Sequence, residues 1–170
     1  MKHFGNRERG FSLIELVITI VVIGILSAVV MINIGAKAQH SVTVQADEFR
    51  RNLSHIQLLA ISQGVRLKLT VASGSYTVAA CPTAACGVAV TDPATGQNFS
   101  VPLTDDVQFT AGVANSPYYF DTIGRPVAGA SGAALVTDPT KLSFSLNGVG
   151  RATDVTVTML PITGFAQTAY

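Results

Sequence analysis

The carboxylate of Glu15 is the group in this sequence whose position most needs a chemical explanation. It directly precedes an uncharged run, residues 16–34, that consists mostly of Val, Ile and Leu. In a helix that crosses a membrane, a carboxylate costs up to about 2.5 to 3.5 kcal/mol at the bilayer centre, so such residues usually have a partner. We therefore expect Glu15 to serve a function.

Residue types that support catalysis or metal binding do not form a recognisable arrangement in this sequence. There is no phosphate-binding loop with Gly-Lys-Ser/Thr, no Gly-x-Ser-x-Gly elbow and no cluster of carboxylates with histidine. His3, His40 and His55 are widely separated and form no ligand pair, and we expect His55 to be solvated. The sequence therefore predicts no enzymatic activity and no metal or cofactor site.

Length and composition limit the fold and the partners. The chain has 170 residues and is 48% hydrophobic, which is enough for one domain with a core and for a further apolar segment. Charged residues make up only 12% of the chain, and the formal net charge is +1. Binding of DNA or another polyanion by bulk electrostatics is therefore not indicated.

The uncharged run has the length of a membrane span. A helix over residues 16–34 would be about 28 Å long, close to the thickness of the hydrocarbon core of a bilayer. No second run of this length follows, so we expect a single crossing with the preceding basic residues in the cytoplasm. A secretory signal has a shorter apolar region of about 7 to 15 residues. A plain membrane anchor fits the length but leaves Glu15 unexplained.

The residues in front of the run carry a resemblance to a known family. The segment Arg9-Gly10-Phe11-Ser12-Leu13-Ile14-Glu15 resembles the prepilin peptidase site of type IV pilins and type II secretion pseudopilins. The resemblance implies that a prepilin peptidase cuts after Gly10 and methylates the new N-terminal Phe11. It also implies that Glu15 pairs with the Phe11 ammonium of a neighbouring subunit during assembly. One departure is that residues 29–33 lack the helix-breaking proline of many major pilins.

The same resemblance implies a division of the chain and a location. Residues 1–10 would be a leader that is removed, 11–35 a helix for the membrane and the filament core, 36–64 an amphipathic helix, and 65–170 a periplasmic head. The leader contains three basic residues and one acidic residue, so the mature chain would keep eight basic and nine acidic residues. The implied partners are the prepilin peptidase, the inner membrane, the inner-membrane assembly platform and other pilins. The subunit would first be a single-pass protein of the bacterial inner membrane and later part of a pilus or pseudopilus.

Beyond the uncharged run, apolar residues recur on one helical face. They are Ala38, Val42, Phe49, Leu53, Ile56 and Ala60. Gly64 is a suitable residue to follow the end of this helix. The sequence therefore predicts an amphipathic helix that packs one side against the rest of the chain.

The remaining residues show the period of β-strands rather than of helices. Residues 65–71 alternate between apolar and polar, and a turn at Ser73-Gly74 leads into residues 76–78, which predicts a hairpin. Residues 142–146 and 155–159 alternate in the same way, and shorter strand candidates occur at residues 99–101, 107–109 and 118–120. We predict an α+β fold, the pilin fold, with a long N-terminal helix packed on a mostly antiparallel β head.

Cys81 and Cys86 are the only cysteines of the chain. Without a nearby histidine they cannot complete a zinc site. Because the implied location is the oxidising periplasm, we expect them to form a disulfide. Such a short loop contributes only about 2 kcal/mol, so it shapes a loop more than it stabilises the fold.

A second resemblance concerns the head. Residues 120–126 are similar to the Phe-x-x-x-Gly-Arg-Pro turn of H-type pseudopilins and FimT-like minor pilins, although Asp121, Gly124 and Pro126 are also good turn residues in general. Residues 155–165 are similar to the last strands of minor pilins from mannose-sensitive haemagglutinin pili, the MshC-like group. The implied function is that of a minor pilin or pseudopilin in the initiating complex of a filament. The alternatives are a FimT-like DNA-uptake pilin, against which the near-neutral charge argues, and a soluble enzyme behind an atypical signal.

Overall fold

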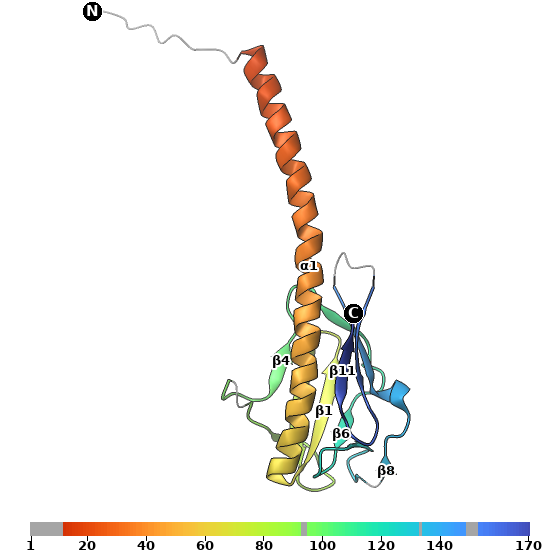
Figure 1. Ribbon diagram of the computed structural model, residues 1–170. Helices are drawn as coiled ribbons and strands as arrows, with labels where there is room; N and C mark the ends of the chain where they lie inside the picture. The colour runs from red at the N-terminus through yellow and green to blue at the C-terminus, as the bar shows by residue number, and fades with distance from the viewer. Residues whose placement is uncertain (1–11, 93–94, 133, 149–152) are drawn as a thin grey trace, which may run out of the picture. The chain divides into compact units, whose positions relative to one another are not determined.

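Figure 1 shows the computed structural model of the chain, which describes residues 12–92, 95–132, 134–148 and 153–170. Of residues 28–39 only the backbone is described. The chain divides into two compact units, Met1–Ala36 and Lys37–Tyr170, and we call the second unit the head. One helix, α1 (Leu13–Gln63), contributes residues to both units.

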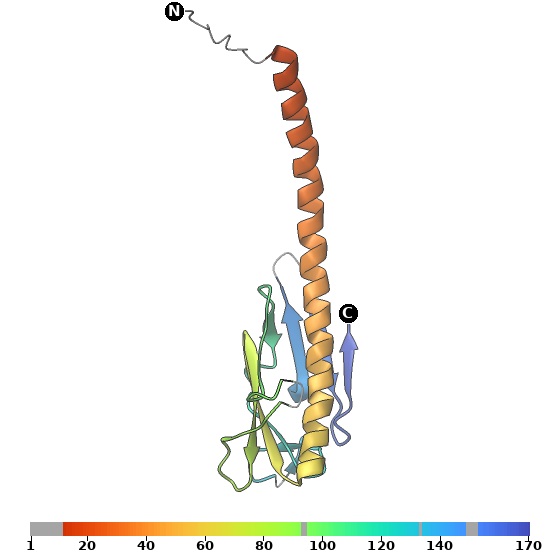
Figure 2. The ribbon, with the colours of Figure 1, turned by 90° about the vertical axis from the view of Figure 1, so that its left-hand side faces the viewer.

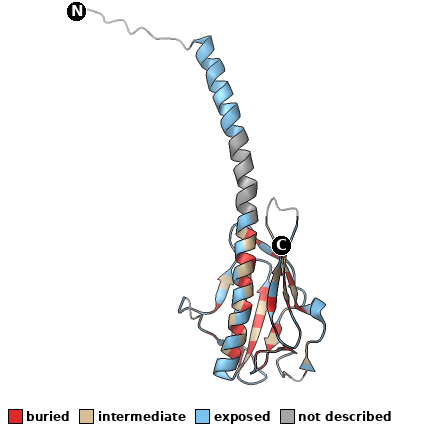
Figure 3. Ribbon diagram, in the orientation of Figure 1, coloured by how far each residue is buried: buried red, intermediate tan, exposed pale blue. Residues whose placement is uncertain are grey.

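The N-terminal unit contains the beginning of α1. The carbonyl of Ser12 accepts hydrogen bonds from the backbone N–H groups of Glu15, at 3.0 Å, and Leu16, at 3.2 Å, and these bonds close the first turn. The hydroxyls of Thr19 and Ser27 donate to backbone carbonyls of the same helix, so these polar groups need no water. All side chains of residues 12–27 are exposed (Figure 3).

Two findings bear on the expected membrane span. In the part of the chain that the structure describes, no helix combines the length and the apolar character needed to cross a membrane. The expected span also includes residues 28–34, whose side chains lie outside the described part.

In the head, α1 buries one face. The residues on this face are completely shielded from solvent: Val42, Ala46, Phe49, Leu53, Ile56 and Ala60. This list confirms the predicted stripe except for Ala38, whose side chain lies outside the described residues, and adds Ala46. Gly64 follows the helix with a φ of 61°, a left-handed conformation that favours glycine and ends the helix as predicted.

The described part of the head contains two antiparallel sheets. The larger has seven strands in the order β3-β2-β1-β6-β7-β8, with β4 paired to β2, and the smaller has the order β11-β10-β9-β5. The strands of the larger sheet are β1 (Arg66–Ala72), β2 (Ser75–Cys81), β3 (Val88–Ala89), β4 (Ser100–Pro102), β6 (Tyr118–Phe120), β7 (Pro126–Ala128) and β8 (Ala134–Leu135). Those of the smaller sheet are β5 (Gln108–Ala111), β9 (Ser143–Asn147), β10 (Val155–Met159) and β11 (Ala166–Ala169). A 3-10 turn, η1 (Pro139–Leu142), precedes β9.

The hairpin and the late strands follow the predicted alternation. In β1 every second residue is buried, and Leu69 lies opposite Val78 of β2 in the antiparallel pair. In β9 and β10 the same alternation buries Phe144 and Val157, which lie opposite each other. The predicted α+β fold with an antiparallel head is confirmed.

Four strands and η1 were not predicted from the sequence. The strands β3, β7, β8 and β11 have between two and four residues each, which is too short for an alternating pattern to be recognised. In addition, β7 begins with Pro126, a residue that lacks the backbone donor of a sheet and is tolerated at the first position of a strand. These strands form by pairing with the edges of neighbouring strands, which only the tertiary structure reveals.

Phe49 joins α1 to both sheets. Its ring makes edge-to-face contacts with Tyr76 of β2 at 4.9 Å and with Phe109 and Phe144 of the smaller sheet at 5.0 Å each. Tyr118 contacts Phe144 at 4.8 Å and so links β6 to β9, and burial raises the pKa of Tyr118 to about 12. Figure 2 shows β1 and β11 on opposite sides of α1. The head therefore has one core, made by the helix and both sheets.

Candidate functional site

The predicted processing site lies at the start of the chain. Gly10 and Phe11, the predicted cleavage and methylation residues, lie outside the described residues. Glu15 is described: it stands in the first turn of α1 with an exposed side chain. Among the residues that the structure describes, no cation forms an ion pair with it.

The side chains on either side of Glu15 form an exposed apolar surface. Leu13 is 81% exposed, and Leu16, Ile20 and Ile23 are each more than half exposed. Contiguous exposed apolar surface of this kind marks interaction with a membrane or another protein. The described side chains of this unit, residues 12–27, consequently form an interaction surface.

The turn at residues 120–126 is built around the carboxylate of Asp121. This carboxylate accepts hydrogen bonds from the backbone N–H of Ile123 at 3.0 Å and of Arg125 at 2.8 Å. It also accepts a hydrogen bond from Nε of Arg125 at 2.8 Å, which completes an ion pair. Asp121 is buried, so its charge is balanced where water is scarce.

The same turn is docked onto α1. Nε2 of Gln57 donates a hydrogen bond to the carbonyl of Gly124 at 2.8 Å. Gly124 has a φ of 79°, and a Cβ atom at this position would lie 3.1 Å from Cδ1 of Ile61 and 3.2 Å from the carbonyl of Gln57. The glycine therefore allows both the left-handed turn and the close approach to the helix. The predicted turn residues thus also attach the turn to α1, a contact that the sequence pattern did not reveal.

The comparisons with known proteins agree with this geometry. Residues 5–31 match the family described as the prokaryotic N-terminal methylation motif, and this segment contains Gly10, Phe11 and Glu15. The fold is similar to a structure of the minor pseudopilin EpsH from the type 2 secretion system of Vibrio cholerae, with a TM-score of 0.52 and 16% identity, covering 76% of this chain and 96% of EpsH. A crystal structure of the same pseudopilin matches with a TM-score of 0.52 and 12% identity, covering 76% of this chain and 93% of that chain. No curated protein matches the chain in sequence.

The chain thus combines an N-terminal methylation motif with the fold of a minor pseudopilin. The motif carries the prepilin-type N-terminus, and the solved structures, at low identity, establish the pilin fold of the head.

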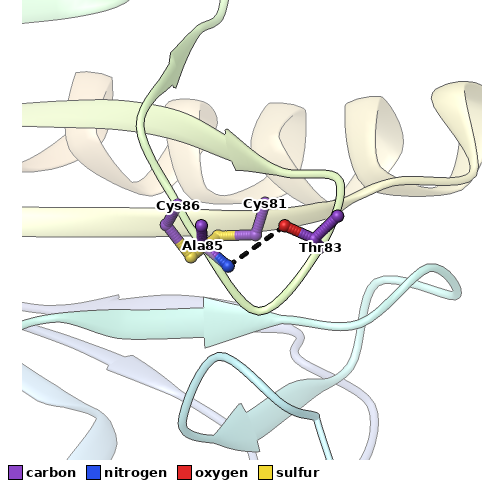
Figure 4. The surroundings of a disulfide bond; sticks show 4 residues. All are labelled: Cys81, Thr83, Ala85 and Cys86. Atoms are coloured by element: carbon purple, nitrogen blue, oxygen red, sulfur yellow. Dashed lines mark hydrogen bonds between the residues drawn. A yellow bond between two sulfur atoms is a disulfide. The ribbon is translucent and has the colours of Figure 1, made fainter.

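The pilin head contains the expected disulfide. Cys81, the last residue of β2, is bonded to Cys86, and their Cα atoms are 4.1 Å apart (Figure 4). Inside the loop, the backbone N–H of Ala85 donates to the hydroxyl of Thr83 at 3.2 Å. After the loop, the backbone N–H of Gly87 donates to the carbonyl of Ala80 at 3.2 Å, so the chain returns beside β2. The bond thus closes a small loop at the end of a strand, as the sequence predicted.

The prediction that His55 is solvated is wrong. This residue of the pilin head is half-buried, and its Nε2 atom is buried without a hydrogen-bond partner. Its ring lies with the centroid 6.3 Å from that of Phe99, which comes from a loop far away in sequence. The helical pattern of α1 could not reveal this packing, because it depends on the path of that loop. Among the described residues, no group of three or more His, Cys, Asp or Glu side chains is arranged to hold a metal ion.

Proposed function

We propose that this chain is a minor pilin or pseudopilin, a structural subunit that takes part in the assembly or initiation of a filament. The observation that carries the proposal is the combination of a prepilin-type N-terminus with an apolar helical segment whose described side chains are all exposed. An apolar surface of this kind is covered by a membrane or by another protein. A filament subunit buries it against neighbours.

The proposed maturation begins with cleavage. A prepilin peptidase removes residues 1–10 on the cytoplasmic side, and methylation of the new N-terminus at Phe11 follows. Until assembly, residues 11–35 anchor the subunit in the inner membrane with the head in the periplasm. On assembly, the carboxylate of Glu15 pairs with the Phe11 ammonium of a neighbouring pilin, and the inner-membrane platform drives this transfer. Both charges lose their water in this contact, and only a well-aligned pair compensates for that loss.

The proposed filament is a pilus of the mannose-sensitive haemagglutinin type or a type II secretion pseudopilus. The similarity of residues 155–165 to minor pilins of the first system supports the pilus. The fold of EpsH, described as a minor pseudopilin of a type 2 secretion system, supports the pseudopilus. Deletion of the gene, followed by counts of surface pili and assays of protein secretion and of DNA uptake, distinguishes these systems.

Mass spectrometry of the chain from membranes and from sheared filaments tests the proposal directly. The expected N-terminus is N-methylated Phe11, and the expected location after assembly is the filament fraction. A native N-terminus at Met1, or a cleavage after Ala28, would contradict the proposal. So would complete absence of the chain from the filaments of its own system.

A DNA-uptake pilin is the second candidate function. The observation that favours it is that Arg66 and Lys68 occupy outward positions of β1, and neither forms an ion pair within the described part of the chain. The near-neutral charge of the mature chain opposes it, because DNA binding at physiological salt requires many phosphate contacts. We expect weak, salt-sensitive binding in an electrophoretic shift assay with the mature chain. Tight binding at physiological salt would favour the DNA-uptake function instead.

A further inference from the structure

An exposed apolar patch lies at the end of the head where α1 ends. It comprises Ile61 of α1, Ile123 of the β6–β7 turn, and Ile162 and Phe165 of the β10–β11 turn. Their side chains are between 53% and 60% exposed, so each leaves more than half of its apolar surface in water. Exposed apolar side chains that stand singly need no explanation, whereas a contiguous group indicates an interaction site.

Contacts around Gln57 bring the three segments of the patch together. Nε2 of Gln57 donates to the carbonyl of Gly124 at 2.8 Å and lies 3.5 Å from the carbonyl of Thr163. A Cβ atom on Gly124 would lie 3.1 Å from Cδ1 of Ile61, and one on Gly164 would lie 3.3 Å from the carbonyl of Gly124. Figure 1 shows the end of α1 and the turn between β10 and β11 at the same end of the head. The three segments that carry the four patch residues therefore meet beside Gln57.

Ile162 is held on this surface in an unfavourable backbone conformation. Its φ is 73°, a value that is a genuine outlier for a β-branched residue. It occupies the centre of a three-residue turn in which the N–H of Thr163 donates to the carbonyl of Pro161 at 2.8 Å. Further hydrogen bonds, from Gly164 to Leu160 at 2.9 Å and from Leu160 to Phe165 at 2.8 Å, hold the turn in place. Glycine or asparagine would adopt this conformation with less strain, so an exposed isoleucine here is a cost without a benefit inside the monomer.

The chain itself contains a surface of matching chemistry. Residues 16–26 of α1 carry no charge, and their side chains are exposed in the N-terminal unit. The patch carries no charged residue either: the nearest ionic group of its turns, Asp121, is paired with Arg125. Two uncharged apolar surfaces bury each other without leaving an unpaired charge in the interface. A contact between two different surfaces of like subunits is heterologous, and it propagates into an open helical assembly when the rotation between subunits does not close into a ring.

We propose that the patch formed by Ile61, Ile123, Ile162 and Phe165 docks the apolar segment, residues 16–26, of the α1 helix of a neighbouring subunit. This inference rests on the proposed function as a filament subunit. The occupant is an uncharged helical surface, which a second copy of this chain presents. The strain at Ile162 is then retained because it directs the isoleucine side chain into the neighbour rather than into the core of its own head.

The decisive experiment compares Ile162→Asn with the wild type in cells that lack the native copy. Because asparagine tolerates a positive φ, the purified mature variant in detergent should unfold at a higher temperature, by about 2 to 4 °C. Its content in sheared filaments should nevertheless fall about tenfold, the change expected when one isoleucine side chain no longer becomes buried. A residue with a merely structural role would not separate stability from incorporation in this way.

A control and a second variant keep the test decisive. Val88→Ser removes another exposed apolar side chain, 55% exposed on β3 and outside the patch, and should leave incorporation unchanged. Ile123→Asn should also reduce incorporation about tenfold. It provides an independent test if Ile162→Asn fails to fold. Normal incorporation of Ile123→Asn, or an equal loss for Val88→Ser, would overturn the proposal.

Photocrosslinking identifies the occupant. A benzophenone amino acid at position 162 of the full chain, activated in growing filaments, should crosslink to peptides from residues 16–26 of a neighbour. Crosslinks only to lipid, or only to head peptides, would refute this docking mode. The cleaved and methylated N-terminus is measured in the same samples: normal processing and incorporation without these crosslinks contradicts the docking alone, whereas an unprocessed chain contradicts the proposed function as well.

Discussion

The two parts of α1 differ in what covers their apolar side chains. In residues 12–27 every side chain is exposed, although most are Ile, Leu or Val. In the head, the same helix buries a single face, with Phe49 at the centre of an aromatic cluster, and leaves its other faces to solvent. An apolar helix that lacks a polar face requires a partner from outside the chain, whereas an amphipathic one is satisfied within it. One helix thus combines an exposed apolar segment with a segment that forms part of the core of the head.

The strongest test of this division is the cleavage site. Gly10→Val should abolish processing, because the peptidase subsite tolerates little side chain, and the precursor should remain in the inner membrane. The head should still fold, because Gly10 lies outside its unit. Mass spectrometry and thermal unfolding of the precursor measure both outcomes.

Gly24→Val is the matched control, since a side chain at Gly24 would meet no atom within 4 Å. This variant should be processed normally. Cleavage of Gly10→Val at the wild-type rate would refute the assignment of the processing site.

The next substitution is on the buried face of α1, in the part of the helix that belongs to the head. Phe49→Ala removes the ring that contacts both sheets and should lower the free energy of unfolding by about 3 to 5 kcal/mol. Leu58→Ala, at an α1 residue that is 60% exposed, should change it by less than about 1 kcal/mol. Urea denaturation of the mature chain measures the difference. Processing after Gly10 should be unaffected in both variants, and a processing defect would show that folding and cleavage are not separate.

Glu15→Ala tests the proposed pairing at the N-terminal end of α1 and changes no residue of the head. Loss of the carboxylate leaves the Phe11 ammonium of the neighbour unpaired, which should weaken incorporation by about 3 kcal/mol. Membrane insertion should survive, because the change removes a charge from the apolar helix. Filament content and membrane content are compared with those of Glu48→Ala, which removes an exposed carboxylate of the head. Equal incorporation of the two variants would argue against the pairing.

Gly164→Ala tests whether the close contact with Gln57 holds the turns against α1. A Cβ atom there would clash with Nε2 of Gln57, so the amide must move and give up its hydrogen bond to Gly124. The free energy of unfolding should fall by about 2 to 3 kcal/mol. Gly96→Ala has the same φ of 70° but no atom within 4 Å, and should cost only about 1 kcal/mol. Equal losses would mean that backbone conformation alone, not the contact with Gln57, requires glycine at position 164.

The smallest effect is expected at the disulfide. Replacing Cys81 and Cys86 by serine together should lower the free energy of unfolding by about 2 kcal/mol, because the closed loop is short. Filament content should remain normal, since the loop lies outside both apolar surfaces. Addition of dithiothreitol to the wild type should reproduce the loss measured for the double variant, and should have no effect on the double variant itself.

Sequence reasoning succeeded where a periodic pattern extends over several residues. The stripe on α1, the alternation in β1, and the paired alternation of β9 and β10 all follow from burial on one face, so each pattern revealed its element. It failed for β7, β8 and β11, which are too short for a period and depend on the edges of their neighbours. It also failed for His55, whose burial depends on a loop that passes over α1.

The amino-acid sequence by itself determined the N-terminal methylation motif and the division of α1 into an uncharged and an amphipathic part. Both are local: the motif consists of adjacent residues, and the faces of a helix follow from its period of 3.6 residues. Only the tertiary structure decided that Gln57 joins the turns at Gly124 and Thr163 to α1, and that Ile162 is exposed beside them with a positive φ. These contacts connect residues that are far apart in the chain, and their existence depends on how the sheets place the turns. No period or motif along the sequence encodes that placement.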